Sequence, residues 1–368
     1  MLERLTHLEM ATKPRSIWVA VLAGGDGQGL RPLTTNARGI STPKQYCSLT
    51  GGRSLLQISL QRALAVTSRE RIVIVVTEAH RRWWERELFA LPRFQVVVQP
   101  SNRGTGLGFL LPLLVIAKSD PEAGVMFIPS DHYVEREAVL AEYLREATAP
   151  EVMDSDKLTL LGMSPHAPDS GFGYLSPVPD SGVGMRPVLD FVEKPERSIA
   201  TELIRSGGIW NSGIIAGRVS QFIALYPRHT RQMILDLRAI VEHWPDSRIP
   251  SAGLTSLYDH HSELDFSSDV LQQRPESLQF MKVPPCGWND VATPERLANA
   301  VNAARAVNVE DFRFAPVRTF NLATAFDRPG FEPRQSPEPM IDSSHPQVAQ
   351  HGFAWVAQSS RLAPYDES

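Results

Sequence analysis

Cysteine is scarce in this chain of 368 residues, which contains only Cys47 and Cys286. The two lie far apart and match no CxxC or zinc-ligand spacing, so the sequence excludes a disulfide framework and a cysteine-based metal site. We therefore expect both to be buried free thiols in a reducing, cytoplasmic compartment. Residues 1–15 alternate charged and apolar types and lack the apolar segment of a secretory signal peptide.

Long apolar runs and an excess of positive charge are also lacking. The longest apolar run, 107–117, contains Pro112 and is well short of the roughly 20 residues that a membrane-spanning helix needs, so we expect a soluble protein with no membrane partner. The net charge of −4 gives no electrostatic reason to expect nucleic-acid binding. The ten histidines form no ligand-spaced cluster, and no HExxH motif is present.

What the first half of the chain does contain is a regular alternation of short apolar runs and helical patterns. Helices are predicted at 79–88 and 106–117. Strands are predicted at 18–22, 72–76, 96–98 and 125–128. Continuous apolar strands separated by helices predict an α/β fold with a mostly parallel, Rossmann-like mixed sheet flanked by helices. In such sheets ligands bind at the carboxyl ends of the strands.

The second half is more mixed, and its end differs in composition. Strands are predicted at 158–163, 174–175 and 188–192, and helices at 199–206, 232–243 and 293–307. Thr293 is the expected N-cap of the last helix, with Pro294 at its first position. We expect a tail at 1–15, one nucleotide-binding domain at 16–308, and an extended or disordered proline-rich tail at 309–368.

A glycine-rich stretch, LAGGDGQGLRPLTTN, follows the first predicted strand at residues 22–36. Glycines let a backbone turn with positive φ and bring its N–H groups close to an anion such as phosphate. A tight turn without a ligand is the alternative. The stretch lacks the Lys-Ser/Thr of a P-loop and the glycine spacing of a dinucleotide fingerprint, which also argues against a nicotinamide-dependent dehydrogenase.

Four further polar stretches stand near predicted strand ends. PKQY carries Lys44, which would contact phosphate or lie solvated on the surface. Asp131 and Asp290 would hold Mg²⁺, or each would cap the following helix. His132, beside Asp131, is expected to pack rather than react. FVEKP places Glu193 and Lys194 side by side; on a strand their side chains point to opposite faces, so we expect no direct pair unless the strand has ended.

Taken together, these stretches resemble the sugar-1-phosphate nucleotidyltransferases, and specifically the mannose-1-phosphate guanylyltransferases. The resemblance covers roughly residues 17–305. Its motifs, each short, occur in the order of that family: LAGGDGQGLRPLT, PKQY, QPSNRGTG, IPSDH, GFGYL, FVEKP, WNSG and GWND. The resemblance implies the nucleotidyltransferase fold, which is GT-A-like.

The resemblance also implies a reaction and a set of roles. An oxygen of a sugar 1-phosphate would attack the α-phosphorus of a nucleoside triphosphate, GTP by overall likeness, and release pyrophosphate. The nucleotide site would include Leu22, Ala23, Gly24, Gly25, Gly27, Gln99, Arg103, Gly104 and Thr105. The sugar site would include Gly173, Glu193, Lys194 and Asn211. The catalytic groups would be Lys44, Asp131, Lys194, Asp290 and Arg31, with Asp131 and Asp290 holding Mg²⁺.

One departure from the family pattern concerns charge. Gly29 stands where the family signature has an arginine, and Arg31 lies two residues further on. The sequence therefore leaves two hypotheses: an active nucleotidyltransferase, for which Gly29→Arg would raise turnover unless it distorts the loop, or a degenerate sugar-nucleotide-binding regulatory protein. The identity of base and sugar, and self-association into a homo-oligomer, stay open at this stage.

Overall fold

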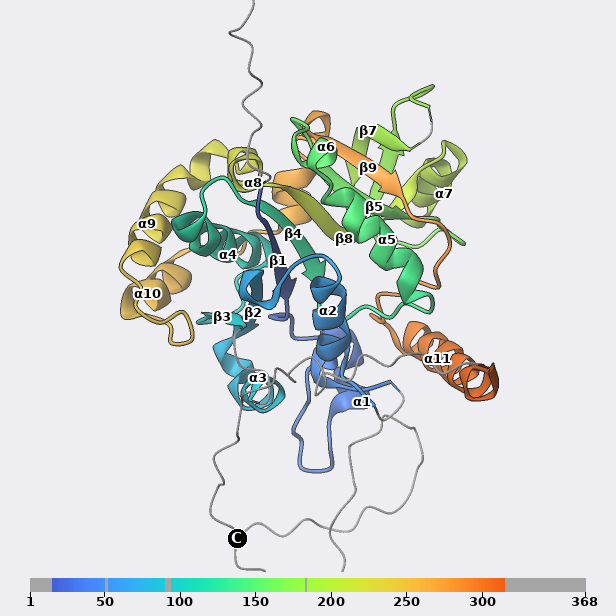
Figure 1. Ribbon diagram of the computed structural model, residues 1–368, viewed down its shortest axis with the longest axis horizontal. Helices are drawn as coiled ribbons and strands as arrows, with labels where there is room; N and C mark the ends of the chain where they lie inside the picture. The colour runs from blue at the N-terminus through green and yellow to red at the C-terminus, as the bar shows by residue number, and fades with distance from the viewer. Residues whose placement is uncertain (1–14, 50–51, 90–93, 183, 315–368) are drawn as a thin grey trace, which may run out of the picture.

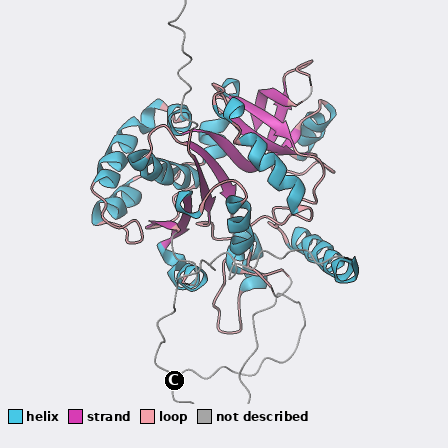
Figure 2. Cartoon of the chain, viewed as in Figure 1, coloured by secondary structure: helices cyan, strands magenta, loops and turns pink. Residues whose placement is uncertain are grey.

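The computed structural model describes residues 15–49, 52–89, 94–182 and 184–314, with side chains to residue 304. At the centre of these ranges is a nine-stranded sheet with helices on both faces (Figures 1 and 2). The strand order is β3-β2-β1-β4-β8-β5-β9-β7-β6, and β8 also pairs with β6. The chain thus forms an α/β architecture around one mixed sheet.

The first four strands are parallel, as predicted. They are β1 (Ile17–Leu22), β2 (Ile72–Thr77), β3 (Gln95–Gln99) and β4 (Gly124–Pro129). Alternate residues enter different cores: Val19 and Val21 of β1 pack on one face, and Ala20 packs on the other. Both faces are therefore buried, which is why these strands are continuously apolar in sequence.

Helices cover each face of this sheet. One core joins the sheet to α4 (Thr105–Ser119), α8 (Val219–Leu225), α9 (Arg231–Glu242) and α10 (Ala252–His260). The other joins it to α2 (Leu55–Leu64), α3 (Arg81–Leu88), α5 (Glu137–Ala147), α6 (Pro150–Met153) and α7 (Arg197–Arg205). The helices predicted at 79–88, 106–117, 199–206 and 232–243 are confirmed within a few residues.

The second half confirms that the sheet is mixed, but it contains more antiparallel pairs than expected. Its strands are β5 (Leu158–Met163), β6 (Tyr174–Pro177), β7 (Met185–Val192), β8 (Ile209–Arg218) and β9 (Leu278–Lys282). β5 and β9 pair in parallel, but β8 runs antiparallel to β4, β5 and β6, and β7 runs antiparallel to β6 and β9. The sheet is mixed because β8 enters its centre in the opposite direction.

The last helix begins where predicted but ends later. α11 spans Pro294–Phe314, and the Thr293 hydroxyl accepts the Arg296 backbone N–H at 3.3 Å, as an N-cap does. The helix passes the predicted end at 307 and the predicted boundary at 308. Residues 308–315 contain no proline or glycine, and Pro316 is the next residue that cannot donate to a helical ladder. The predicted tails lie otherwise outside the described residues.

Two expectations from composition can be compared with the structure. Neither Cys47 nor Cys286 forms a disulfide among the described residues, and both are buried. Among the described helices, none is long and apolar enough to cross a membrane.

Candidate active site

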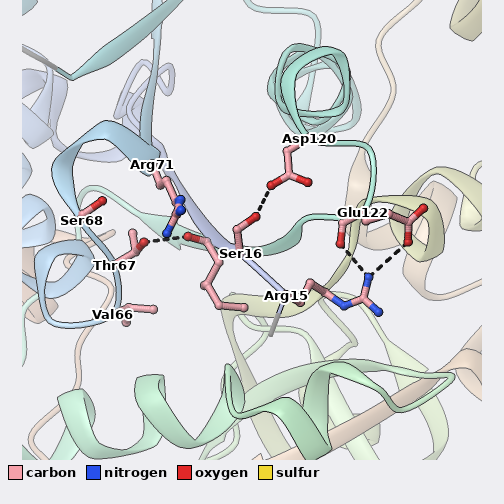
Figure 3. A pocket seen from close by; sticks show the side chains of 9 residues that line it. Arg15, Ser16, Val66, Thr67, Ser68, Arg71, Asp120 and Glu122 are labelled. Carbon is pink, nitrogen blue, oxygen red and sulfur yellow. Dashed lines mark hydrogen bonds and ion pairs between the residues drawn. The ribbon is translucent and has the colours of Figure 1, made fainter. Parts of the chain in front are cut away.

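The predicted site residues gather at the carboxyl ends of the first strands. The glycine-rich stretch follows β1, Gln99 ends β3, and Asp131 comes two residues after β4. A separate pocket lies at the amino ends of the strands. It is lined by Arg15, Ser16 and residues that precede β2 and β4 (Figure 3). There Arg15 already pairs with Glu122 and Asp154. The carboxyl edge is therefore the candidate site.

The glycine loop is held in place by a neighbouring side chain. The Gln45 side-chain amide donates to the carbonyl oxygens of Ala23 and Gly25, both at 2.9 Å. Gly27 takes φ +60°, which favours glycine. A Cβ on Gly24 would lie 2.8 Å from the Gln99 amide nitrogen. The loop is thus pre-formed, and it is pinned by Gln45, a residue for which the motifs predict no role.

Lys44 is the central cation of the site. Its Nζ lies 3.0 Å from Oδ2 of Asp131 and donates to the backbone carbonyl of Asp290 at 2.9 Å. The side chain is only 11% exposed, so the alternative of a solvated surface lysine is wrong. The single ammonium brings the loops after β4 and before α11 to one point.

Asp131 does not cap a helix. The next helix, α5, begins at Glu137, and the Asp131 carboxylate instead faces Lys44. Burial is the largest single influence on Asp131 and opposes its ionisation, but the charge and hydrogen bond of Lys44, the neighbouring His132 and a backbone hydrogen bond together hold the pKa of this carboxyl below its usual range. An ionised carboxylate at this point is suited to bind a cation.

His132 packs against an aromatic neighbour, as expected. Trp288 Nε1 donates to His132 Nδ1 at 3.2 Å, and the two rings meet edge to face. Burial lowers the pKa of His132 to about 4, so the imidazole is neutral at pH 7. The neutral ring, held by Trp288, packs beside Asp131.

Asp290 does not cap the following helix either, since Thr293 does so. Its carboxylate faces Arg296, whose Nη1 donates to both oxygens at 2.9 and 2.8 Å. Nη2 of the same guanidinium pairs with Asp169. The backbone of Asp290 therefore faces Lys44, while its carboxylate already has a cation of its own.

The base-side residues are close together but differ in which of their side-chain groups are hydrogen-bonded within the fold. Gln99 is 5% exposed, and Tyr258 of α10 donates its hydroxyl to Gln99 Oε1 at 3.2 Å. The Thr105 hydroxyl donates to Asp265 at 3.0 Å and accepts the Phe266 N–H. Thr105 is therefore engaged within the fold, whereas the Gln99 amide nitrogen faces Gly24. No motif in the sequence points to Tyr258.

Two neighbours complete the base side. Arg103 Nη2 lies 3.9 Å from Asp259. Gly104 takes φ +85°, and a Cβ there would lie 2.3 Å from the Leu264 carbonyl oxygen. This close approach explains why glycine stands there.

The predicted sugar residues also come together. A Cβ on Gly173 would lie 2.5 Å from Glu193 Oε2, and the Asn211 N–H donates to the Gly173 carbonyl at 2.8 Å. Burial raises the pKa of Glu193. Lys194 Nζ lies 3.4 Å from Glu193 Oε1, a pair that the sequence allows only where the strand has ended. β7 ends at Val192, and Lys194 takes φ +46°, which turns both side chains together.

The loop position that departs from the family pattern is exposed, but the backbone of Ala292 lies close to it. A Cβ on Gly29 would lie 2.4 Å from the backbone oxygen of Ala292. Gly29→Arg would therefore displace backbone before its guanidinium reached any phosphate. Arg31 is exposed and lines a hollow with Gln28, Pro32 and Thr35.

The candidate donors for a hard divalent cation are two carboxylates, those of Asp131 and Asp290. Across the described ranges, no group of three or more His, Cys, Asp or Glu side chains could hold a metal. Mg²⁺ commonly rests on one or two carboxylates together with substrate phosphates, and Lys44 contacts both Asp131 and Asp290. Such an ion would need substrate oxygens to complete its coordination.

Comparisons with known proteins show which family the chain resembles. The nucleotidyl transferase family model matches residues 19–306. The alginate biosynthesis protein AlgA of Pseudomonas syringae pv. tomato is 29% identical over 280 residues, which cover 74% of this chain and 55% of that protein. Mannose-1-phosphate guanylyltransferase 2 of Escherichia coli O157:H7 is 27% identical over 307 residues, which cover 76% and 59%.

A solved structure is also similar. It is titled mannose-1-phosphate geranyltransferase, from Thermus thermophilus, and has a TM-score of 0.63 at 25% identity, covering 75% of this chain and 76% of that one. The chain spans somewhat more than half the length of the curated relatives it matches.

Proposed function

The chain belongs to the nucleotidyl transferase family, and from this premise we propose that it transfers a nucleotidyl group from a nucleoside triphosphate to a sugar 1-phosphate. The observation that carries the proposal is the position of Lys44. The backbone nitrogen and first side-chain carbons of Lys44 lie beside Gly27 of the glycine loop, and its ammonium joins Asp131 to the backbone of Asp290. Cationic and acidic groups thus converge where the loop would receive phosphates.

In this reaction the sugar phosphate oxygen attacks the α-phosphorus in line, and pyrophosphate leaves. The chain's contribution is to position the reactants and to stabilise the developing charge. Lys44 would neutralise phosphate oxygens, and the backbone N–H groups at Gly24, Gly25 and Gly27 would lie along the triphosphate. When bound to Asp131 and Asp290, Mg²⁺ would supply further charge neutralisation.

The substrates proposed are GTP and mannose 1-phosphate, because a relative is named as a mannose-1-phosphate guanylyltransferase. Gln99 would face the base, with its amide oriented by Tyr258. Glu193 and Asn211 would face the sugar, and Lys194 its phosphate. Hydrogen bonds to buried polar groups are a strong source of such selectivity.

The test is a pyrophosphate-release assay of the full chain with Mg²⁺, four nucleoside triphosphates and several sugar 1-phosphates. We expect release with GTP and mannose 1-phosphate, and its loss in Asp131→Asn. Release with no pair, together with binding of labelled GDP-mannose, would instead support the non-catalytic regulatory protein that Gly29 suggests.

A further inference from the structure

Arg296 links two acidic residues of the site. Its guanidinium donates to both oxygens of Asp290 and also pairs with Asp169. The guanidinium carbon lies 4.1 Å from the centre of the Phe172 ring. The side chain is 16% exposed, as is that of Asp290. The contact is therefore a partly buried, charge-assisted one.

This arrangement leaves the Asp290 carboxylate without an unengaged oxygen. Oδ1 also accepts the Ala292 N–H at 3.2 Å. A cation that binds Asp290 must therefore share or displace the Arg296 contact. The guanidinium retains two other partners, Asp169 and the Phe172 ring, so it can leave Asp290 without losing all its contacts.

We propose that the Arg296 guanidinium competes with a divalent cation for the carboxylate of Asp290. The inference rests on the proposed function, because it takes Asp290 as a cation ligand. Its consequence is that the chain binds the cation more weakly than the two carboxylates alone would. A contact between charged groups of this kind corresponds to roughly a tenfold change in affinity.

The test measures Mn²⁺ binding by electron paramagnetic resonance in the full chain with GDP-mannose present, which supplies the phosphate oxygens that the ion needs. Arg296→Gln and Arg296→Met remove the charge, and the methionine keeps an apolar contact with Phe172. Arg81→Gln is the matched control, since Arg81 also pairs with two carboxylates, Glu78 and Glu85, and lies over a ring, that of Trp84. Circular dichroism checks that each variant is folded.

We expect Arg296→Gln and Arg296→Met to bind Mn²⁺ roughly tenfold more tightly, and Arg81→Gln to bind as the wild type does. Adding Asp290→Asn should remove the gain. Equal Mn²⁺ affinity in wild type and both folded variants would overturn the inference and leave the reaction intact. Absence of Mn²⁺ binding in every protein would overturn the inference together with the metal assignment. Absence of pyrophosphate release by a wild type that still binds Mn²⁺ would instead count against the proposed function.

Discussion

At the scale of single residues, the two aspartates proposed to hold the cation already have basic partners. Lys44 pairs with Asp131, and Arg296 pairs with Asp290. A substrate with several phosphates must therefore exchange these contacts rather than meet free charges. Lys44 is a side chain that would change partners in this way, and Gly29 lies in the glycine loop.

Lys44→Met is expected to lower turnover by about 100-fold or more, because a preorganised donor to the phosphates is lost. Pyrophosphate release measures the effect. Lys118→Met is the control, because Lys118 also donates to backbone carbonyls, those of Val241 and Glu242, which belong to no proposed site. Turnover of Lys44→Met within twofold of wild type would contradict the role given to this lysine.

Gly29→Ala is expected to lower the melting temperature by several degrees, since its Cβ would meet the Ala292 backbone oxygen at 2.4 Å. Gly25→Ala is the matched control, because a Cβ there meets nothing within 4 Å. Calorimetry compares the two. Equal melting temperatures would show that the loop yields easily, and Gly29→Arg would then become a usable test of the missing charge.

At the scale of elements, β8 depends on an irregularity near its middle. Opposite β5 the register shifts, and Gly213 takes φ +74°. The Asn211 side chain accepts the Gly213 N–H, and the Ser212 hydroxyl accepts that of Ile214. The side chains of the WNSG motif thus bind backbone N–H groups of their own strand, in addition to any contact of Asn211 with a sugar.

Gly213→Ala is expected to cost about 1 kcal/mol or more of unfolding free energy, because alanine is strained at positive φ. Gly253→Ala in α10 is the control, since its Cβ would make an ordinary contact 3.6 Å from Ile240. Denaturant titration of both variants gives the comparison. A Gly213→Ala protein as stable as the control would mean that the bend in β8 relaxes without strain.

The elements also show what can and cannot be predicted from sequence. Strands such as β2 and β5 are predictable because a strand buried on both faces is continuously apolar. β8 is not, because Asn211, Ser212 and Gly213 interrupt its apolar run. Short motifs indicate most of the residues of the candidate site, but they miss Tyr258 and Arg296, whose partners Gln99 and Asp169 come from distant segments that no local pattern reveals.

At the scale of the whole molecule, the site draws on segments from Leu22 to Arg296. Removing residues 315–368 is therefore expected to leave pyrophosphate release unchanged, since every proposed site residue precedes them. Side-by-side assays of the full chain and the shortened one measure this. A loss of turnover or of folded protein on shortening would show that the core needs these residues.

The central place of β8 has a consequence for how the protein is made. The ribosome delivers β4, ending at Pro129, well before β8, which begins at Ile209. Until then the outer edge of β4 lacks its partner strand, and unpaired apolar edges invite other chains to add to them. A nascent chain paused between these two strands is therefore exposed to aggregation, and a chaperone that covers the edge of β4 would protect it.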